Sequence, residues 1–392
     1  MMRVIKLALF GLETRYVGKL YLQRALIALF ALSAMVMAID ISVNFDTVTS
    51  TSGARGLDEP TLRIAFYLLL RFSYNLPAII PLSCAIGIVW SELTLARGFE
   101  RAMIINTGRS GLMSLAPAAL VGVTLGLLQV FSMAVLRPMS VEAHAQHGFR
   151  TSYGPRLGQM GPTEHWITLP DAVLHARIDF RVDPPDLRDI TIYKLGQEKR
   201  LRAIIMAPAS GFEGQVLTLT DASLWALDAE NSAQVRTRFL LNPVWLRNTG
   251  LEPRFWTHAD LISVTRQTAG VSRPEIYRAI LQSRYAGFIR LVAISVLMAT
   301  LCFAMMRLRP GLSVAIKLAA AGYGLQFLTQ YLTTLGKHGH LAPVPAFWGL
   351  PGLVILLVVA HHMRQGFVVR RATLRPAATI IGKDRRRLSR RV

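Results

Sequence analysis

Few residues in this chain stand at spacings that support catalysis. The sequence contains no G-x-x-x-x-G-K-[ST] run, and its nearest approach, Gly311 to Lys317, lacks the second glycine of a nucleotide-binding loop. An H-E-x-x-H zinc motif is also absent from the sequence. His144 and His147 are three residues apart and would share a helix face, but no further metal ligand stands near them in sequence. We therefore expect no enzymatic activity, no metal site and no cofactor bound by this chain.

One loop has the composition of a surface that binds another protein. Residues 97–110 read R-G-F-E-R-A-M-I-I-N-T-G-R-S, which predicts a short amphipathic helix near 97–108 that ends at Gly108. We expect Phe99, Ala102 and Ile105 on its apolar face. We expect Glu100, Arg101 and Asn106 elsewhere on the helix. A helix of this kind either lies on lipid headgroups or docks into a groove on a separate ATPase.

The composition excludes several classes of protein. Only 17% of the 392 residues are charged and 52% are hydrophobic, whereas soluble domains carry about 25% charged residues. The chain is too apolar to be disordered, and its two cysteines cannot form a disulfide scaffold. Nucleic-acid-binding proteins share the net charge of +21 but are not this apolar, so we expect no nucleic-acid partner. A basic and apolar chain is typical of an integral membrane protein.

Long stretches without charge predict six transmembrane helices, because a membrane span needs about 20 mostly apolar residues. The stretches are 25–39 with 41–45, 72–91, 110–136, 291–306, 318–336 and 338–363. The first is the weakest because Asp40 interrupts it, and a buried helix of a soluble protein is the alternative for any one stretch alone. Residues 31–38 also resemble the apolar part of a signal peptide, but the segment before them is too long, so we expect no cleavage.

Residues 138–272 have the pattern of one soluble all-β domain inserted between the third and fourth spans. Short β-rich runs are separated by turn residues such as those at 183–185 and 211–214, without helical periodicity. The expected strands are His165–Leu169, Val173–Phe180, Ile190–Tyr193, Ala203–Met206, Val216–Thr220 and Val235–Leu241. The chain is thus expected to divide into three spans in 1–137, the β domain in 138–272, three spans in 273–366 and a basic tail in 367–392.

The distribution of charge predicts the orientation in the membrane. Four segments that fall on one side of alternating spans carry +18 of the net charge of +21: the N-terminus, the loops after spans two and four, and the C-terminal tail. Positive charge collects on the cytoplasmic side, so both termini are expected in the cytoplasm and the β domain outside. The basic residues expected at the outer ends of spans are Arg71, Arg284 and Arg290, which either extend to lipid headgroups or bind an anionic substrate.

Two motifs connect this order of elements to a known family. The motif S-E-L-x-x-L-R-A-A-G-x-S is similar to the loop after span two, and G-x-L-x-P-x-x-A-x-W-x-x-P to the approach to span six. The residues that match them are Glu100, Ala102, Gly108 and Ser110, and Gly339, Leu341, Pro343, Ala346, Trp348 and Pro351. With three spans, a β domain and three spans, the chain resembles the lipopolysaccharide export permease family, LptF/LptG, from about residue 15 to 365.

The resemblance implies a membrane α-helical bundle of six transmembrane helices with an inserted all-β, jellyroll-like periplasmic domain. It implies an ABC transporter permease of the inner membrane that extracts lipopolysaccharide and passes it to periplasmic jellyroll bridge proteins of the LptC/LptA type. The other implied partners are a paired LptF/LptG-type permease and a cytoplasmic LptB-type ATPase dimer, which binds the ATP. The resemblance implies an ATPase contact at Glu100, Arg101, Ile105 and Gly108. The residues expected at the substrate are Arg71, Arg284 and Arg290.

The sequence departs from the family at several positions and leaves alternatives open. Arg101 and Asn106 stand where the family more often has Leu and Ala, and Asp40 and Asp46 stand where some members have lysines near lipid A phosphates. Residues 136–140 and the Asp40 end of span one favour a G-like subunit over an F-like one without deciding between them. Another ABC exporter permease, for example for lipoproteins, and a membrane scaffold that pairs through its β domain are the alternative functions.

Overall fold

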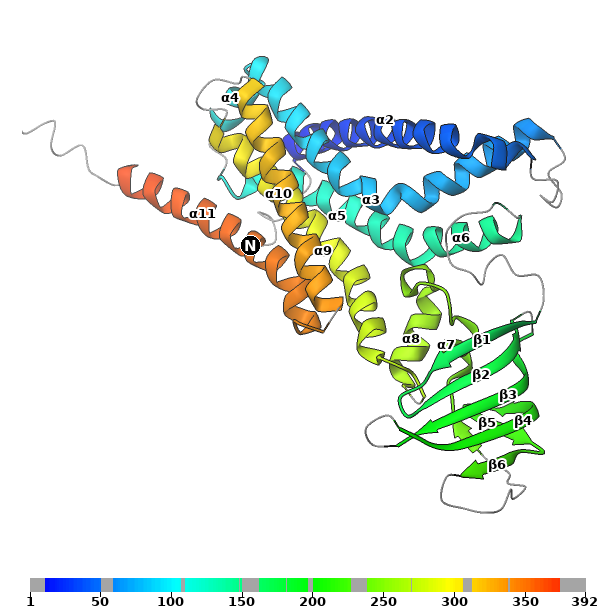
Figure 1. Ribbon diagram of the computed structural model, residues 1–392. Coiled ribbons are helices and arrows are strands. Elements are labelled where there is room, and N and C mark those ends of the chain that lie inside the picture. The colour runs from blue at the N-terminus through cyan, green and yellow to red at the C-terminus, as the bar shows by residue number, and fades with distance from the viewer. Residues whose placement is uncertain are drawn as a thin grey trace, which may run out of the picture.

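In the computed structural model, long helices form a bundle and an antiparallel sheet lies at one end of it, while the short helix α4 (Glu100–Asn106) lies at the other end (Figure 1). The structure describes residues 11–50, 59–106, 110–147, 149, 162–180, 182–196, 200–226, 238–268, 270–305, 312–337 and 339–373. The basic tail expected in 367–392 therefore lies outside the described residues from 374 onward.

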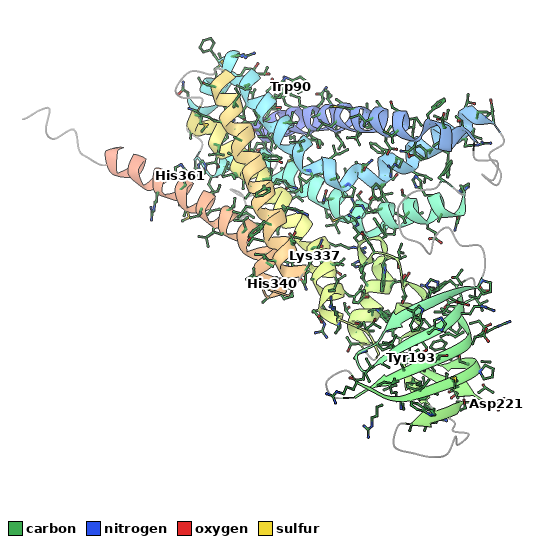
Figure 2. All side chains as sticks on the ribbon, viewed as in Figure 1. Trp90, Tyr193, Asp221, Lys337, His340 and His361 are labelled. Carbon is green, nitrogen blue, oxygen red and sulfur yellow. The ribbon has the colours of Figure 1, made fainter. Side chains whose placement is uncertain are left out.

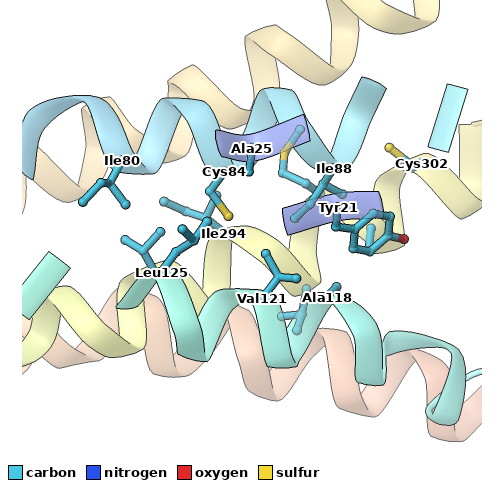
Figure 3. Packing of buried hydrophobic residues seen from close by; sticks show 14 of the residues in the cluster. Tyr21, Ala25, Ile80, Cys84, Ile88, Ala118, Val121, Leu125, Ile294 and Cys302 are labelled. Carbon is cyan, nitrogen blue, oxygen red and sulfur yellow. The ribbon is translucent and has the colours of Figure 1, made fainter. Parts of the chain in front are cut away.

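The two N-terminal helices, α2 (Leu12–Ser50) and α3 (Pro60–Arg97), pack against each other along much of their length. Their closest approach is at Gly87, where an added Cβ would lie 2.5 Å from the Cα of Ala25. Small residues allow such close packing of apolar helices, which is a common basis of association inside membranes. Tyr21, Ala25, Cys84 and Ile88 are buried at this contact (Figure 3).

Two prolines lie inside α3, Pro77 and Pro81, and a side chain from another helix compensates for the second. Proline has no backbone N–H, so Pro81 leaves the carbonyl of Pro77, four residues earlier, without its helical donor. The Nε2 of Gln129, which is buried in α5 (Ala116–Phe131), donates to that carbonyl at 2.9 Å. The break in the backbone ladder of α3 is thereby linked to α5.

The remaining long helices complete the bundle. α5 continues through a π turn, η2 (Ser132–Leu136), into α6 (Arg137–Gln146), so the third helical segment extends past the expected domain boundary at 138. The C-terminal half consists of α9 (Pro274–Met305), α10 (Leu312–Lys337), a π turn η7 (Pro345–Gly349) and α11 (Leu350–Thr373). α9 contacts α3, α5, α10 and α11, which places it at the centre of the bundle.

Five helical segments of the described chain have the length and apolar composition of membrane spans. They are Leu12–Asp46, Pro60–Arg97, Met113–Gln146, Pro274–Met305 and Pro345–Arg364. Five of the six expected spans are therefore confirmed as candidates, including the first. The expected span at 318–336 is helical, within α10, but is not among these candidates.

The sheet is a meander of antiparallel strands. Its strands are β1 (Thr163–Thr168), β2 (Ala172–Asp179), β3 (Asp186–Leu195), β4 (Leu201–Glu213), β5 (Val216–Thr220), β6 (Ser223–Ala226) and β7 (Arg238–Leu240). Consecutive strands pair from β1 to β5, β7 pairs with β5, and β6 pairs with β4. β5 and β6 keep one register against β4, so they form one arm that is interrupted at Asp221, where φ is 50°. This strand order does not establish a jellyroll, which stays a prediction.

All six expected strands are present, and three details of the expectation are wrong. β4 extends through Gly211 to Glu213, which were expected to separate strands, because the turn falls at Gly214, where φ is +65°. β6 was not expected. The segment is also not all-β, since it contains the short helices α7 (Pro243–Arg247) and α8 (His258–Arg266) beside a 3-10 turn, η5 (Pro253–Phe255).

One face of the sheet is buried against helices α7, α8 and the beginning of α9. Tyr277 of α9 packs against Trp256 with ring centroids 4.8 Å apart, and its hydroxyl accepts a hydrogen bond of 2.7 Å from the Nε1 of Trp245 in α7. α9 therefore belongs both to the bundle and to the core of the sheet domain. This shared helix fixes the sheet at one end of the bundle (Figure 1).

The close contact at Gly87 predicts a difference between two helical glycines. Gly87→Ala is expected to lower the melting temperature of the chain in detergent, because its Cβ would overlap the backbone of α2 at Ala25. Gly324→Ala is the matched control, since nothing described lies within 4 Å of a Cβ at that position of α10. Alanine favours helix over glycine by about 1 kcal/mol, so Gly324→Ala should leave the melting temperature equal or higher. Equal melting temperatures for both variants would contradict the close contact.

Candidate functional site

A basic cavity lies inside the bundle, toward the end that carries the sheet. Its volume is about 390 Å³, and side chains of α3, α5, η2, α9 and α10 line it. Five of the lining residues are cations, whereas none of the described lining residues is acidic. The cations are Arg137, Arg254, Arg284, Arg290 and Lys337. Lys337 stands at the end of α10 nearer the sheet (Figure 2).

Two of these cations also join walls of the cavity, and a third forms a local ion pair. Arg284 is buried, and one of its terminal nitrogens, Nη2, donates to the backbone carbonyl of Trp256 at 2.7 Å, next to η5. Arg137 donates through Nε to the carbonyl of Tyr74 in α3 at 3.2 Å. Arg254 forms an ion pair with Glu252, outside the cavity lining. The contact of Arg137 joins α6 to α3 and that of Arg284 joins α9 to the segment around η5, whereas the ion pair of Arg254 is local.

The other two cations, Arg290 and Lys337, have no ion pair with any acid in the described chain. The Nε of Arg290 and the Nη1 of Arg284 are both buried without a hydrogen-bond partner among the described residues. Burying a cation without a counter-charge is costly. An anionic group in the cavity would offset that cost and satisfy these donors with charge-assisted hydrogen bonds.

Polar uncharged side chains complete the lining. One stripe of α10 supplies Gln326, Thr329, Gln330 and Thr333 at the three- and four-residue spacing of one helix face. The Oε1 of Gln326 is buried without a described hydrogen-bond partner. The cavity therefore offers amide groups and hydroxyls next to its cations, which suits a ligand with several polar groups.

An apolar groove continues from the basic cavity. Its volume is about 460 Å³, and it is lined by α3, α9 and α10. Ala78, Pro81 and Gln326 line both spaces, so the cavity and the groove adjoin. The lining of the groove includes Leu82, Ile86, Val89, Trp90, Ile294, Met298 and Tyr323. A basic space beside an apolar one matches a molecule that has an anionic head and an acyl chain.

Two of the three residues expected at the substrate, Arg284 and Arg290, line the cavity, whereas Arg71 lies elsewhere. Arg71 is mostly buried and forms an ion pair with Asp40 of α2, to which its Nε donates at 2.8 Å. Tyr67 donates to the same carboxylate at 2.7 Å. Arg71 thus joins α2 to α3 through its ion pair with Asp40.

At the opposite end of the bundle, α4 presents an arrangement that differs from the expected one. Glu100 is exposed and accepts a hydrogen bond of 2.9 Å from the hydroxyl of Tyr16 in α2. Arg101 was expected on an accessible face, but it is buried beside Glu92 of α3. Phe99, expected on the apolar face, is 73% exposed, and Met103 is 68% exposed.

The other two residues expected at the ATPase contact receive no such assignment. Ile105 belongs to α4, but its side chain is outside the described part of the chain, as is Gly108 altogether.

His144 is buried in α6, its Nδ1 lies 2.8 Å from the carbonyl of Ser140, and its ring packs on Tyr67. Across the described residues, no cluster of three or more His, Cys, Asp or Glu could hold a metal ion.

Five helices with the length and apolar composition of membrane spans, with a basic cavity among them, are typical of an integral membrane protein. Sequence comparison makes this more specific, because the family model described as lipopolysaccharide export system permease LptF/LptG matches residues 15–364. The chain belongs to the LptF/LptG family of transporter permeases. None of the curated proteins matches it significantly.

Lys337, Gln326 and the other cavity residues of α10 were not expected from the sequence. The signal for them was present, because a polar stripe at helical spacing inside an apolar segment indicates an internal surface. Lys337 was read only as the boundary between two spans. Its place in the cavity depends on how α10 packs on α9, which no local pattern records.

The Arg71 and Asp40 ion pair yields a prediction about stability. Arg71→Leu is expected to destabilise the chain by roughly 3 kcal/mol, because it leaves the buried Asp40 carboxylate without its counter-charge. The double variant Asp40→Asn with Arg71→Leu should lose less, since no unpaired charge remains. Thermal unfolding in detergent is measured for Arg71→Leu, for Asp40→Asn and for the double variant. A double variant that loses the sum of the two single effects would show that the residues act independently.

Proposed function

We propose that this chain is one of two permease subunits of an ABC transporter of the bacterial inner membrane. The transporter extracts lipopolysaccharide from that membrane and passes it to a periplasmic bridge that leads toward the outer membrane. The family supports the role in lipopolysaccharide export. The basic cavity and its adjoining apolar groove are the observation that supports direct contact of this chain with the substrate.

The chemistry of lipopolysaccharide fits this pair of spaces. Its lipid A carries phosphates, which suit Arg290, Arg284 and Lys337, and acyl chains, which suit the groove along α3 and α10. Moving acyl chains out of the bilayer costs about 0.8 kcal/mol for each CH₂ group that enters water. An apolar groove lowers this cost, and ATP hydrolysis by a partner supplies the remainder.

The orientation of the chain in the membrane is inferred from the positive charge in the segments at the α4 end of the bundle. The positive charge of the N-terminus, of the loop around α4 and of the tail supports a cytoplasmic location for α4 and both termini. The sheet domain then lies in the periplasm, with the jellyroll-like fold of the family. α10 is the sixth span, and its polar stripe lines the cavity.

The ATPase contact is assigned to the exposed side of α4. Glu100 is accessible there, and the exposed Phe99 and Met103 flank it with apolar surface. An apolar centre with a charged residue beside it is typical of the residues that dominate a protein interface. The contact is therefore made by Glu100, Phe99 and Met103, to a cytoplasmic ATPase dimer of the LptB type.

The other two partners are assigned to apolar and open surfaces. α2 leaves a row of large apolar side chains exposed that suits lipid or the paired LptF/LptG-type permease: Phe30, Met35, Ile39 and Val43. β1 pairs on only one side among the described strands, so its outer edge can add a strand from a jellyroll bridge protein of the LptC/LptA type.

Replacing Arg290 tests the proposed substrate contact. A photoreactive phenylalanine derivative at Tyr323, in the groove, should crosslink to lipopolysaccharide in membranes. Arg290→Ala is expected to lower that crosslinking about tenfold, the effect of losing one charge-assisted hydrogen bond, without lowering membrane insertion.

Arg278→Ala provides the matched control, because Arg278 is exposed on the same helix and does not line the cavity. Its crosslinking should equal that of the unaltered chain. Unchanged crosslinking in Arg290→Ala would remove the cavity from the substrate path, and crosslinking to phospholipid alone would contradict lipopolysaccharide as the substrate.

A further inference from the structure

A buried ion pair connects α4 to the long helices at the end of the bundle opposite the sheet. The Nε of Arg101 lies 3.2 Å from the Oε2 of Glu92, which stands near the end of α3. The Glu92 side chain is fully buried and that of Arg101 is 8% exposed. Charged groups are almost never buried to this extent unless they are paired, so each of these residues requires the other.

Two more helices meet at this ion pair. The hydroxyl of Tyr21 in α2 donates to the other carboxylate oxygen of Glu92. The guanidinium of Arg101 lies over the ring of Phe303 in α9, with its central carbon 4.0 Å from the ring centroid, which is cation–π geometry. Tyr21 belongs to the apolar core shown in Figure 3. One charged pair therefore links α2, α3, α4 and α9.

α4 depends on such a link because its own sequence does little to fix it. The helix has seven residues, which is shorter than a helix that is stable alone in water. Phe99, directly before it, has a φ of 58°, a backbone conformation that costs energy for a residue other than glycine. α4 is held by the exposed hydrogen bond of Glu100 with Tyr16, by packing of Ile104 on the bundle core, and by Arg101, whose ion pair is the buried charged contact of this helix.

The geometry of the pair also suits transmission of movement. Neither Oε2 of Glu92 nor any guanidinium nitrogen of Arg101 makes an aligned hydrogen bond with a described residue. The attraction between the two charges falls off slowly with distance and depends little on angle. The pair can therefore stay intact while α4 shifts, so that the shift acts on Glu92 and on the Phe303 ring.

We propose that Arg101 is a positioning residue that acts through Glu92 and Tyr21 to transmit displacement of α4 to α2, α3 and α9. This rests on the proposed function, in which α4 contacts the ATPase. α9 lines the substrate cavity at its other end with Arg284 and Arg290. The pair thus connects the ATPase contact with a helix that carries cationic walls of the cavity.

The test compares three variants of the full chain. Arg101→Leu leaves the buried Glu92 without its counter-charge. Glu92→Gln together with Arg101→Leu removes both charges, and so restores stability without restoring the link. Arg97→Leu is the matched control, since Arg97 is exposed in the last turn of α3. A spin label at Met103→Cys, used only in the isolated chain, reports the mobility of α4, and both native cysteines are buried.

Two readouts separate a positioning role from a structural one. In the chain alone, the label should become more mobile in Arg101→Leu and in the double variant, but not in Arg97→Leu. In the complex with its ATPase and partner permease, both variants should hydrolyse at least about fivefold more ATP for each lipopolysaccharide released, with ATPase binding unchanged. The melting temperature of the double variant should return toward that of the unaltered chain.

A double variant that recovers both its melting temperature and its ratio of ATP to released lipid would overturn the proposal, because the pair would then serve stability alone. Unchanged mobility of the label in Arg101→Leu would overturn it equally. If the unaltered complex releases no lipopolysaccharide, the proposed function fails instead. In that case the mobility of the label still decides whether Arg101 fixes α4.

Discussion

A cation inside an apolar helical bundle needs a counter-charge, and the structure satisfies this need at some positions and not at others. Arg71 is paired with Asp40 at one end of α2 and α3, and Arg101 is paired with Glu92 near the other end. Arg290 and Lys337 line a cavity in which no described residue is acidic. The two ion pairs hold the helices in place, whereas the unpaired cations create a site for an anion.

The sequence predicts the elements well because their signals are local. Charge-free stretches locate the spans and alternating residues locate the strands, and Arg284 and Arg290, singled out at the start of the fourth span, line the cavity. The ion pair of Arg71 could not be foreseen, because Asp40 is 31 positions away in α2 and the register between two helices has no local sequence signal. Arg71 was therefore assigned to the substrate. Arg101 was placed on the wrong face because a seven-residue helix offers too few positions to define its buried side.

The elements that were missed depend on short signals or on packing. α7 begins after Asn242, whose side chain accepts from two backbone N–H groups, and α8 begins after Thr257, which caps it in the same way. Both caps are readable in the sequence, but helices this short produce no apolar periodicity. The role of Lys337 has no such signal, because it arises only when α10 packs beside α9 and forms the wall of the cavity.

The central claim is that the basic cavity binds the anionic groups of the transported lipid. The most direct measurement compares the affinity of the purified chain, in neutral detergent, for lipopolysaccharide with and without its lipid A phosphates. The account predicts that removing the phosphates weakens binding at least about tenfold, equivalent to about 1.4 kcal/mol, and that Arg290→Ala removes most of this difference. Equal affinity for the two lipids would contradict it, because the cations of the cavity would then have no anionic ligand.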